Sequence, residues 1–69
     1  MPYRGPEDLP ATLQRRLPPH AREIYCSAFN RAWASYRARP DREAVSHKVA
    51  WAAVRRLYRR QGASWVARA

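Results

Sequence analysis

Two segments with helical periodicity hold nearly all the large apolar side chains of this 69-residue chain, so they decide what it can fold into. Over residues 20–36, apolar and aromatic residues occupy one half of a helical wheel, and charged or polar residues occupy the other. Over residues 41–61, an apolar arc opposes an arc of basic residues. Pro40 disfavours helical geometry in the short stretch between them, and so short a connection predicts antiparallel neighbours. We therefore expect two long amphipathic helices that pack against each other.

A shorter helix is expected ahead of these two. Leu9, Leu13 and Leu17 recur at i, i+4 and i+8, and Asp8 precedes them as a suitable N-terminal cap. The Pro-Pro pair that follows Leu17 ends this helix, because proline has no amide donor, and it also opens the next helix.

The two ends of the chain are expected to be extended. Residues 1–8 contain two prolines and a glycine, which predicts an arm anchored by Tyr3. Gly62 is expected to end the third helix in a left-handed conformation, and residues 64–66 are compatible with a short strand. We predict a mainly α fold: a compact three-helix domain, a single unit over residues 1–69, with a small two-stranded sheet formed by the N- and C-terminal segments.

The apolar stripes of these elements predict the core. All three tryptophans are better placed in this core than on the surface, which argues against a stacking platform for unpaired bases. The expected structural core residues are Tyr3, Leu13, Leu17, Ile24, Tyr25, Phe29, Trp33, Tyr36, His47, Trp51, Val54, Tyr58 and Trp65.

Little in the chain predicts catalysis. His47 could act as a pH switch or a general base, but a histidine on an apolar helix face is more often packed and hydrogen-bonded. His20 is expected to cap a helix or stay exposed, and Cys26 to be a semi-buried structural thiol. Five acidic residues, two histidines and no glycine-rich phosphate loop leave too few groups for an active site. We expect a non-enzymatic protein with no catalytic residues.

Cysteine count and hydropathy restrict the chain further. One cysteine cannot form an intramolecular disulfide, and together with two histidines it falls short of a zinc ligand set. We therefore expect no metal and no cofactor. The longest apolar run, residues 49–54, is far shorter than the roughly 20 residues of a membrane-spanning helix, and the N-terminus lacks a signal-peptide pattern. A cytoplasmic location is expected, or a peripheral one at the inner face of the membrane.

Positive charge is the strongest indication of function. The formal net charge is +9, and thirteen of the fourteen basic residues are arginine. Residues 37–69 carry nine basic groups and two acidic ones, so most of the excess lies in the C-terminal half. Such a surface favours polyanions. The residues expected to bind a polyanion or a protein partner are Arg37, Arg39, Arg42, Lys48, Arg55, Arg56, Arg59 and Arg60. The alternative is that these arginines form a solvated surface and reflect genomic base composition.

Two motifs stand out along the chain, A-F-N-R-A-W at residues 28–33 and H-K-V-A-W-A-A-V at residues 47–54. Their order and composition resemble the ChaB family, and the match covers nearly the whole chain. The remaining residues that carry the resemblance are Met1-Pro2-Tyr3, Leu9-Pro10, Leu17-Pro18, His20-Ala21, Ile24-Tyr25, Tyr36, Tyr58 and Trp65.

The resemblance implies three helices with a small sheet that joins the terminal segments. It also implies a regulator of cation transport linked to the ChaA sodium, calcium and potassium/proton antiporter, with no catalytic residue to carry over. This chain departs from the family pattern in a shorter segment between the second and third helices and in a more basic surface. We therefore predict a small regulatory protein that binds a cation/proton antiporter or another acidic protein. The alternative is a small nucleic-acid-binding protein that uses the arginine face of the third helix.

Overall fold

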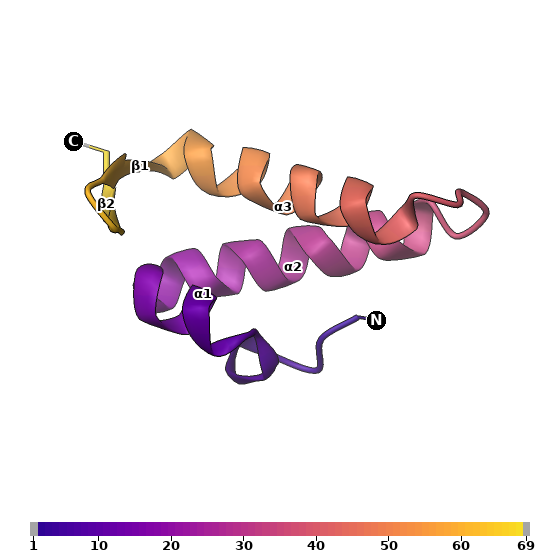
Figure 1. Ribbon diagram of the computed structural model, residues 1–69, viewed down its shortest axis with the longest axis horizontal. Helices are drawn as coiled ribbons and strands as arrows, with labels where there is room; N and C mark the ends of the chain where they lie inside the picture. Colours follow the sequence, from indigo (N-terminus) through magenta and orange to yellow (C-terminus); the bar gives the residue numbers. More distant parts are fainter. Residues whose placement is uncertain (1, 69) are drawn as a thin grey trace.

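A computed structural model describes residues 2–68. Three helices and a small two-stranded antiparallel sheet confirm the mainly α fold. Figure 1 shows the two long helices, the second and third in the chain, side by side in opposite directions. The short first helix lies beside the second helix, and the strands lie beyond the C-terminal end of the third. In chain order the elements are a 3₁₀ turn η1 (Pro6–Asp8), α1 (Ala11–Arg16), α2 (Pro19–Ser35), α3 (Arg42–Leu57), β1 (Tyr58–Gln61) and β2 (Ser64–Ala67).

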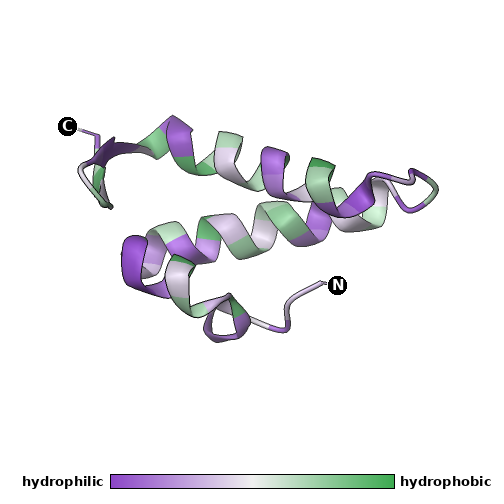
Figure 2. Cartoon of the chain, in the orientation of Figure 1, coloured by the Kyte–Doolittle hydropathy of each residue, from purple (hydrophilic) through white to green (hydrophobic). Residues whose placement is uncertain are grey.

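The seam between α2 and α3 forms the centre of the core. Hydrophobic and hydrophilic residues alternate along both helices (Figure 2), and the hydrophobic side of each faces the other. On α3, the buried residues Ser46, Ala50 and Val54 recur every fourth position, and their small side chains let the helices approach closely. Tyr25 and Phe29 on α2 are almost fully buried, and full burial of such a side chain contributes about 1.5–3 kcal/mol.

The sheet differs from its predicted composition, because both of its strands come from the C-terminal segment. β1 and β2 form a hairpin in which Gln61 lies opposite Ser64. Gly62, at the first of the two turn positions, has a φ of 63°, as a type II′ turn requires. Its left-handed conformation therefore belongs to this turn and not to a helix end. The third helix was expected to reach about residue 61 but ends at Leu57. Residues 58–61 pair instead with β2, because closing the two-residue loop between the strands costs less entropy than pairing with the distant N-terminal segment.

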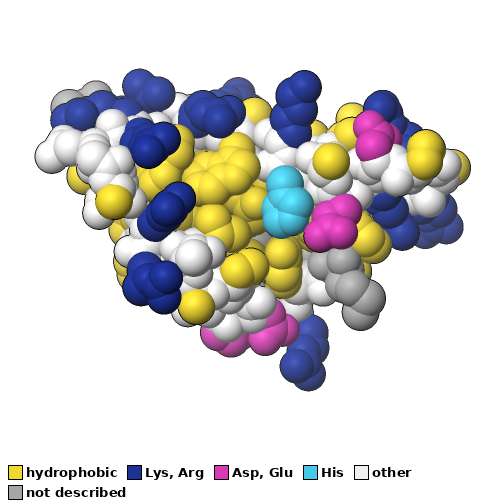
Figure 3. All heavy atoms as spheres, in the orientation of Figure 1, with side chains coloured by type: hydrophobic (Ala, Val, Ile, Leu, Met, Phe, Trp, Pro, Cys, Tyr) yellow, Lys and Arg dark blue, Asp and Glu magenta, His cyan; other side chains and the backbone are white. Residues whose placement is uncertain are grey.

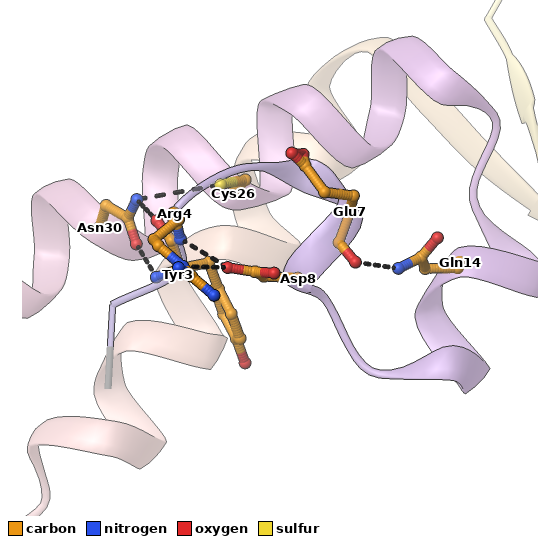
Figure 4. A network of polar contacts seen from close by, with 7 residues as sticks. All are labelled: Tyr3, Arg4, Glu7, Asp8, Gln14, Cys26 and Asn30. Atoms are coloured by element: carbon orange, nitrogen blue, oxygen red, sulfur yellow. Dashed lines mark hydrogen bonds and ion pairs between the residues drawn. The ribbon is translucent and has the colours of Figure 1, made fainter.

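The N-terminal arm is attached to α2 and takes no part in the sheet. Tyr3 N–H donates to Asn30 Oδ1 at 2.9 Å, and Asn30 Nδ2 donates to the Tyr3 carbonyl at 2.8 Å (Figure 4). One side-chain amide thus replaces the neighbouring strand that the sequence had suggested. The Tyr3 ring packs on Phe29, with 4.8 Å between ring centroids, while Trp65 packs on Trp51 at 5.2 Å. The expected contact between the two chain ends is therefore wrong.

Three further expectations change at the helix ends. Asp8 does not cap α1, because its carboxylate accepts from the backbone and guanidinium of Arg4 (Figure 4). Pro10 occupies the cap position. Tyr36 was expected in the core but is 36% exposed, because α2 ends at Ser35 and the chain turns away from the seam. Leu57, on the expected apolar arc of α3, is 53% exposed where the helix gives way to the strand.

Candidate interaction surface

The basic residues singled out from the sequence fall into two groups in space. The first lies around the turn between α2 and α3, and the second runs along α3 into the hairpin. The turn group consists of Arg37, Arg39 and Arg42. The C-terminal group consists of Lys48, Arg55, Arg56, Arg59 and Arg60.

The turn group is largely occupied by contacts within the protein. Arg42 Nε donates to the Trp33 carbonyl at 2.8 Å, and its guanidinium lies 3.9 Å from the centre of the Trp33 ring. This residue therefore joins the start of α3 to the last turn of α2, where a cation is favourable. Arg39 forms a two-point ion pair with Asp41, at 2.9 and 3.0 Å. Side-chain hydrogen bonding between the two residues lowers the pKa of Asp41 and raises the pKa of Arg39. Arg37 is exposed.

The C-terminal group does not lie on one helix face, because Arg59 and Arg60 belong to β1. Successive strand residues point to opposite faces of a sheet, so these two arginines point in opposite directions. Arg60 lies opposite Trp65 on β2, and Arg59 lies opposite Val66. Within residues 2–68, ion pairs join Arg4 to Asp8 and Arg39 to Asp41, and His47 lies 3.8 Å from the Glu43 carboxylate. None of these contacts involves the C-terminal group.

A cleft of about 230 Å³ lies where α1, α3 and the hairpin meet. Figure 3 shows hydrophobic surface on this side of the molecule with Lys and Arg side chains beside it, at the end that carries the hairpin. The residues that line the cleft are Arg16, Trp51, Arg55, Arg60, Ala63 and Trp65.

Sequence reasoning missed this cleft for two reasons. Arg16 was not among the expected binding residues, because α1 shows only a leucine repeat and nothing in the pattern places its last turn beside the hairpin. Trp51 and Trp65 were assigned to the core, yet both are only partly buried and contribute to the lining. The one signal in the sequence was Arg16 itself. It is a basic residue just before Leu17, at the end of a helix too short to bury both of its faces.

His47 is part of a polar chain between the two long helices. The hydroxyl of the buried Tyr25 is hydrogen-bonded to His47 Nδ1, and His47 Nε2 lies 3.8 Å from the Glu43 carboxylate. Burial raises the pKa of Tyr25, so its hydroxyl keeps its proton further into the alkaline range than an exposed tyrosine does. The position of His47 between a buried phenol and an exposed carboxylate links the core to the surface.

The other two reactive side chains have structural surroundings. Cys26 is buried, its sulfur faces the Asn30 side-chain amide at 3.8 Å, and burial raises the pKa of its thiol (Figure 4). His20 Nδ1 lies 3.3 Å from the hydroxyl of Tyr58. In the part of the chain that the structure describes, no three His, Cys, Asp or Glu side chains cluster as metal ligands would. Over the same residues, no helix is both long and apolar enough to cross a membrane.

Comparison with known proteins identifies the family. The ChaB family model matches residues 9–68. A curated protein from Escherichia coli strain K12, named "Putative cation transport regulator ChaB", is 47% identical over 64 residues, which cover 84% of each chain. The protein of the same name from Shigella flexneri matches equally well. The chain belongs to the ChaB family. A solved structure, titled "NMR solution structure of the putative cation transport regulator ChaB", is 41% identical, and the match covers 99% of this chain and 100% of that one with a TM-score of 0.85.

The two ChaB motifs now have defined contacts. In A-F-N-R-A-W, Phe29 packs on Tyr3 and Asn30 holds the backbone of the arm. In H-K-V-A-W-A-A-V, His47 is hydrogen-bonded to Tyr25, and Trp51 meets the same tyrosine edge-on at 5.1 Å. The ChaB signature residues of the two long helices therefore meet in the core, and the arm is attached through the first motif.

Proposed function

We propose that this protein is a non-enzymatic regulator of cation transport that acts by binding another protein at the cytoplasmic face of the membrane. The observation that carries the proposal is the match to proteins named "Putative cation transport regulator ChaB", at 47% identity over 84% of each chain. The proposed partner is a sodium-calcium/proton antiporter. The side chains of Asn30, Arg42 and His47 are engaged in contacts that hold the arm and the two long helices together, which supports a structural role for them.

The four arginines of the C-terminal group supply the proposed contact surface. Arg55, Arg56, Arg59 and Arg60 are exposed and lie within a few residues of one another across the end of α3 and β1. Their guanidinium groups can form paired hydrogen bonds to carboxylates of an acidic loop. Contacts of this kind raise the association rate and make binding sensitive to salt.

Direct binding tests the proposal. The purified protein is titrated against the detergent-solubilised antiporter of its own host, at low and at near-physiological salt. The matched variant replaces all four arginines with glutamine, and a control replaces Arg15 and Arg31, which are exposed basic residues outside the group. We expect binding that weakens with salt, that is lost in the quadruple variant and that is kept in the control. No binding of the wild-type protein at low salt would refute the proposed partner.

Binding to nucleic acid is a second candidate, favoured by the absence of carboxylate partners for the C-terminal group among residues 2–68. Arginines on a surface neutralise phosphates and release counterions, so affinity would fall steeply as salt rises. Labelled duplex and single-stranded DNA, titrated at two salt concentrations, test it. Affinity that is absent at low salt, or unchanged in the quadruple variant, would mean that these arginines are a solvated surface.

A further inference from the structure

We propose that the cleft between α1, α3 and the hairpin is a binding site for a nucleotide unit, in which a base lies against the indoles and a phosphate against the arginines. The cleft brings together Arg16, Arg55 and Arg60 with Trp51 and Trp65. This inference goes beyond regulation of transport. It is also more specific than general binding of nucleic acid, because it assigns a defined role to only part of the cationic surface.

The two indoles provide a flat apolar wall. Trp51 and Trp65 are stacked, with 5.2 Å between centroids and 29° between ring planes. Trp51 is held from the other direction by the buried Tyr25, which meets it at 77°. The pair therefore extends outward from the core on a fixed support, and its partly exposed surface can receive another flat ring. Stacking on such a surface tolerates any base, because every base has a π-face.

Three arginines line the same cleft as the two indoles and remain able to bind an anion. None of Arg16, Arg55 and Arg60 forms an ion pair with a carboxylate of residues 2–68. Arg60 Nε donates to the Gly62 carbonyl at 3.1 Å, which fixes the direction of the side chain and leaves its two terminal nitrogens as donors. Arg60 also lies directly opposite Trp65 in the hairpin, so the phosphate and ring contacts are neighbours across one strand pair.

The shape and chemistry of the cleft favour a nucleotide over an acidic peptide. An aspartate or glutamate side chain carries its charge on a short flexible chain with no aromatic ring, so it would leave the indole wall uncovered. A nucleotide joins a ring to a dianion or monoanion within one unit and uses both features. The volume of about 230 Å³ is below the roughly 300–1,000 Å³ of pockets that enclose drug-sized ligands, so a nucleotide unit in this cleft would stay partly exposed to solvent. Free mononucleotides and single units of an unpaired strand share this chemistry.

Two adjacent pairs of arginines give a matched test. The double variant Arg55→Gln with Arg60→Gln removes two cleft residues, while Arg56→Gln with Arg59→Gln removes two neighbouring charges that do not line the cleft. Both variants have the same composition and net charge, so nonspecific attraction falls equally in the two. The probes are adenosine monophosphate, a short single-stranded oligoadenylate, inorganic phosphate and polyglutamate. Binding is followed by NMR through the three indole N–H signals, each assigned by a Trp→Phe variant.

The site predicts a specific pattern of results. The indole signals of Trp51 and Trp65 should shift with the mononucleotide or the oligonucleotide, while that of Trp33, under Arg42, should stay in place. The cleft double variant should weaken binding at least about tenfold more than the outer one, since it loses charge-assisted hydrogen bonds. Binding of both probes indicates a site for the free nucleotide, and binding of the oligonucleotide alone indicates a site for an unpaired strand.

Other results would overturn the proposal. These are equal effects of the two double variants, binding that leaves the Trp51 and Trp65 signals unmoved, polyglutamate affinity that matches the oligonucleotide, or no binding of either nucleotide probe at low salt. If glutamine at Arg55 and Arg60 disturbs the fold, lysine at both positions keeps the charge, removes the planar fork and should still weaken binding. Because the antiporter assay uses a different ligand, loss of regulation and loss of this site can be told apart.

Discussion

Replacing Asn30 with alanine tests how the N-terminal arm is attached. The side chain makes two hydrogen bonds to the Tyr3 backbone, at 2.9 and 2.8 Å, and each such bond contributes about 0.5–1.5 kcal/mol. Release of the arm also removes the Tyr3 contact with Phe29, which adds about 0.5–1.5 kcal/mol. The arm regains conformational freedom, which offsets part of this loss. We expect the free energy of unfolding to fall by roughly 1.5–3 kcal/mol.

That loss is large for a chain of 69 residues, whose total stability is of the order of 3–10 kcal/mol. Urea unfolding followed by circular dichroism measures it, and hydrogen exchange of the Tyr3 amide reports on the arm directly. Arg31→Ala, at the exposed neighbouring position, is the control and should change stability by less than about 0.5 kcal/mol. In the variant, the Tyr3 amide should exchange at the rate of an unfolded segment.

A truncated chain separates attachment of the arm from any other role of Asn30. In a protein that lacks residues 2–4, Asn30 has lost its partner in the arm. Asn30→Ala should then leave the free energy of unfolding almost unchanged. A cost in the truncated chain equal to that in the full chain would refute the reasoning, because the side chain would then stabilise α2 independently of the arm.

Three other substitutions test the core and the turns. Arg42→Ala should lower the free energy of unfolding by about 1–3 kcal/mol, since it removes the hydrogen bond and the cation–π contact to Trp33; an unchanged urea midpoint would contradict this. Gly62→Ala should cost about 1–2 kcal/mol, because alanine is strained at a φ of 63°, and an equally stable variant would exclude the described turn. Burial raises the pKa of Tyr25, so its contribution to stability is complete below about pH 10 and is lost above it, where the unfolded chain releases the proton first. Urea unfolding between neutral and about pH 11 should show a shallower decline in Tyr25→Phe than in the wild-type protein, and parallel curves would contradict the assignment.

Periodicity was sufficient to predict that there are three helices, because their apolar faces recur at helical spacing and prolines mark the boundaries between them, but it did not predict the end of α3 at Leu57. It could not predict the partner of β2. Residues 58–61 continue the helical pattern of α3, and only the two-residue turn at Gly62 makes a local hairpin cheaper than a sheet with the arm. In the same way, Asn30 lies on the polar side of the helical wheel of α2. Nothing in a single sequence shows that its side-chain amide forms hydrogen bonds with the backbone of the arm.

The candidate site was predictable as a charge excess but not as a geometry. Composition showed that the C-terminal half is cationic, yet it could not distinguish Arg42, which is stacked on Trp33, from arginines that remain exposed. The helical pattern also placed Arg59 and Arg60 on one helix face, whereas in the strand they point to opposite sides of the sheet. Recognition of Arg16 as a neighbour of the hairpin requires the tertiary fold.

Cation exchange in membrane vesicles tests regulation of transport most directly. Inside-out vesicles that contain the sodium-calcium/proton antiporter of the native host expose its cytoplasmic face, and proton exchange driven by added sodium or calcium is measured with and without the purified protein. We predict that the wild-type protein changes the exchange rate in a saturable way and that the variant with glutamine at Arg55, Arg56, Arg59 and Arg60 does not. An exchange rate that is unchanged at saturating wild-type protein would contradict the proposed role as a regulator of cation transport.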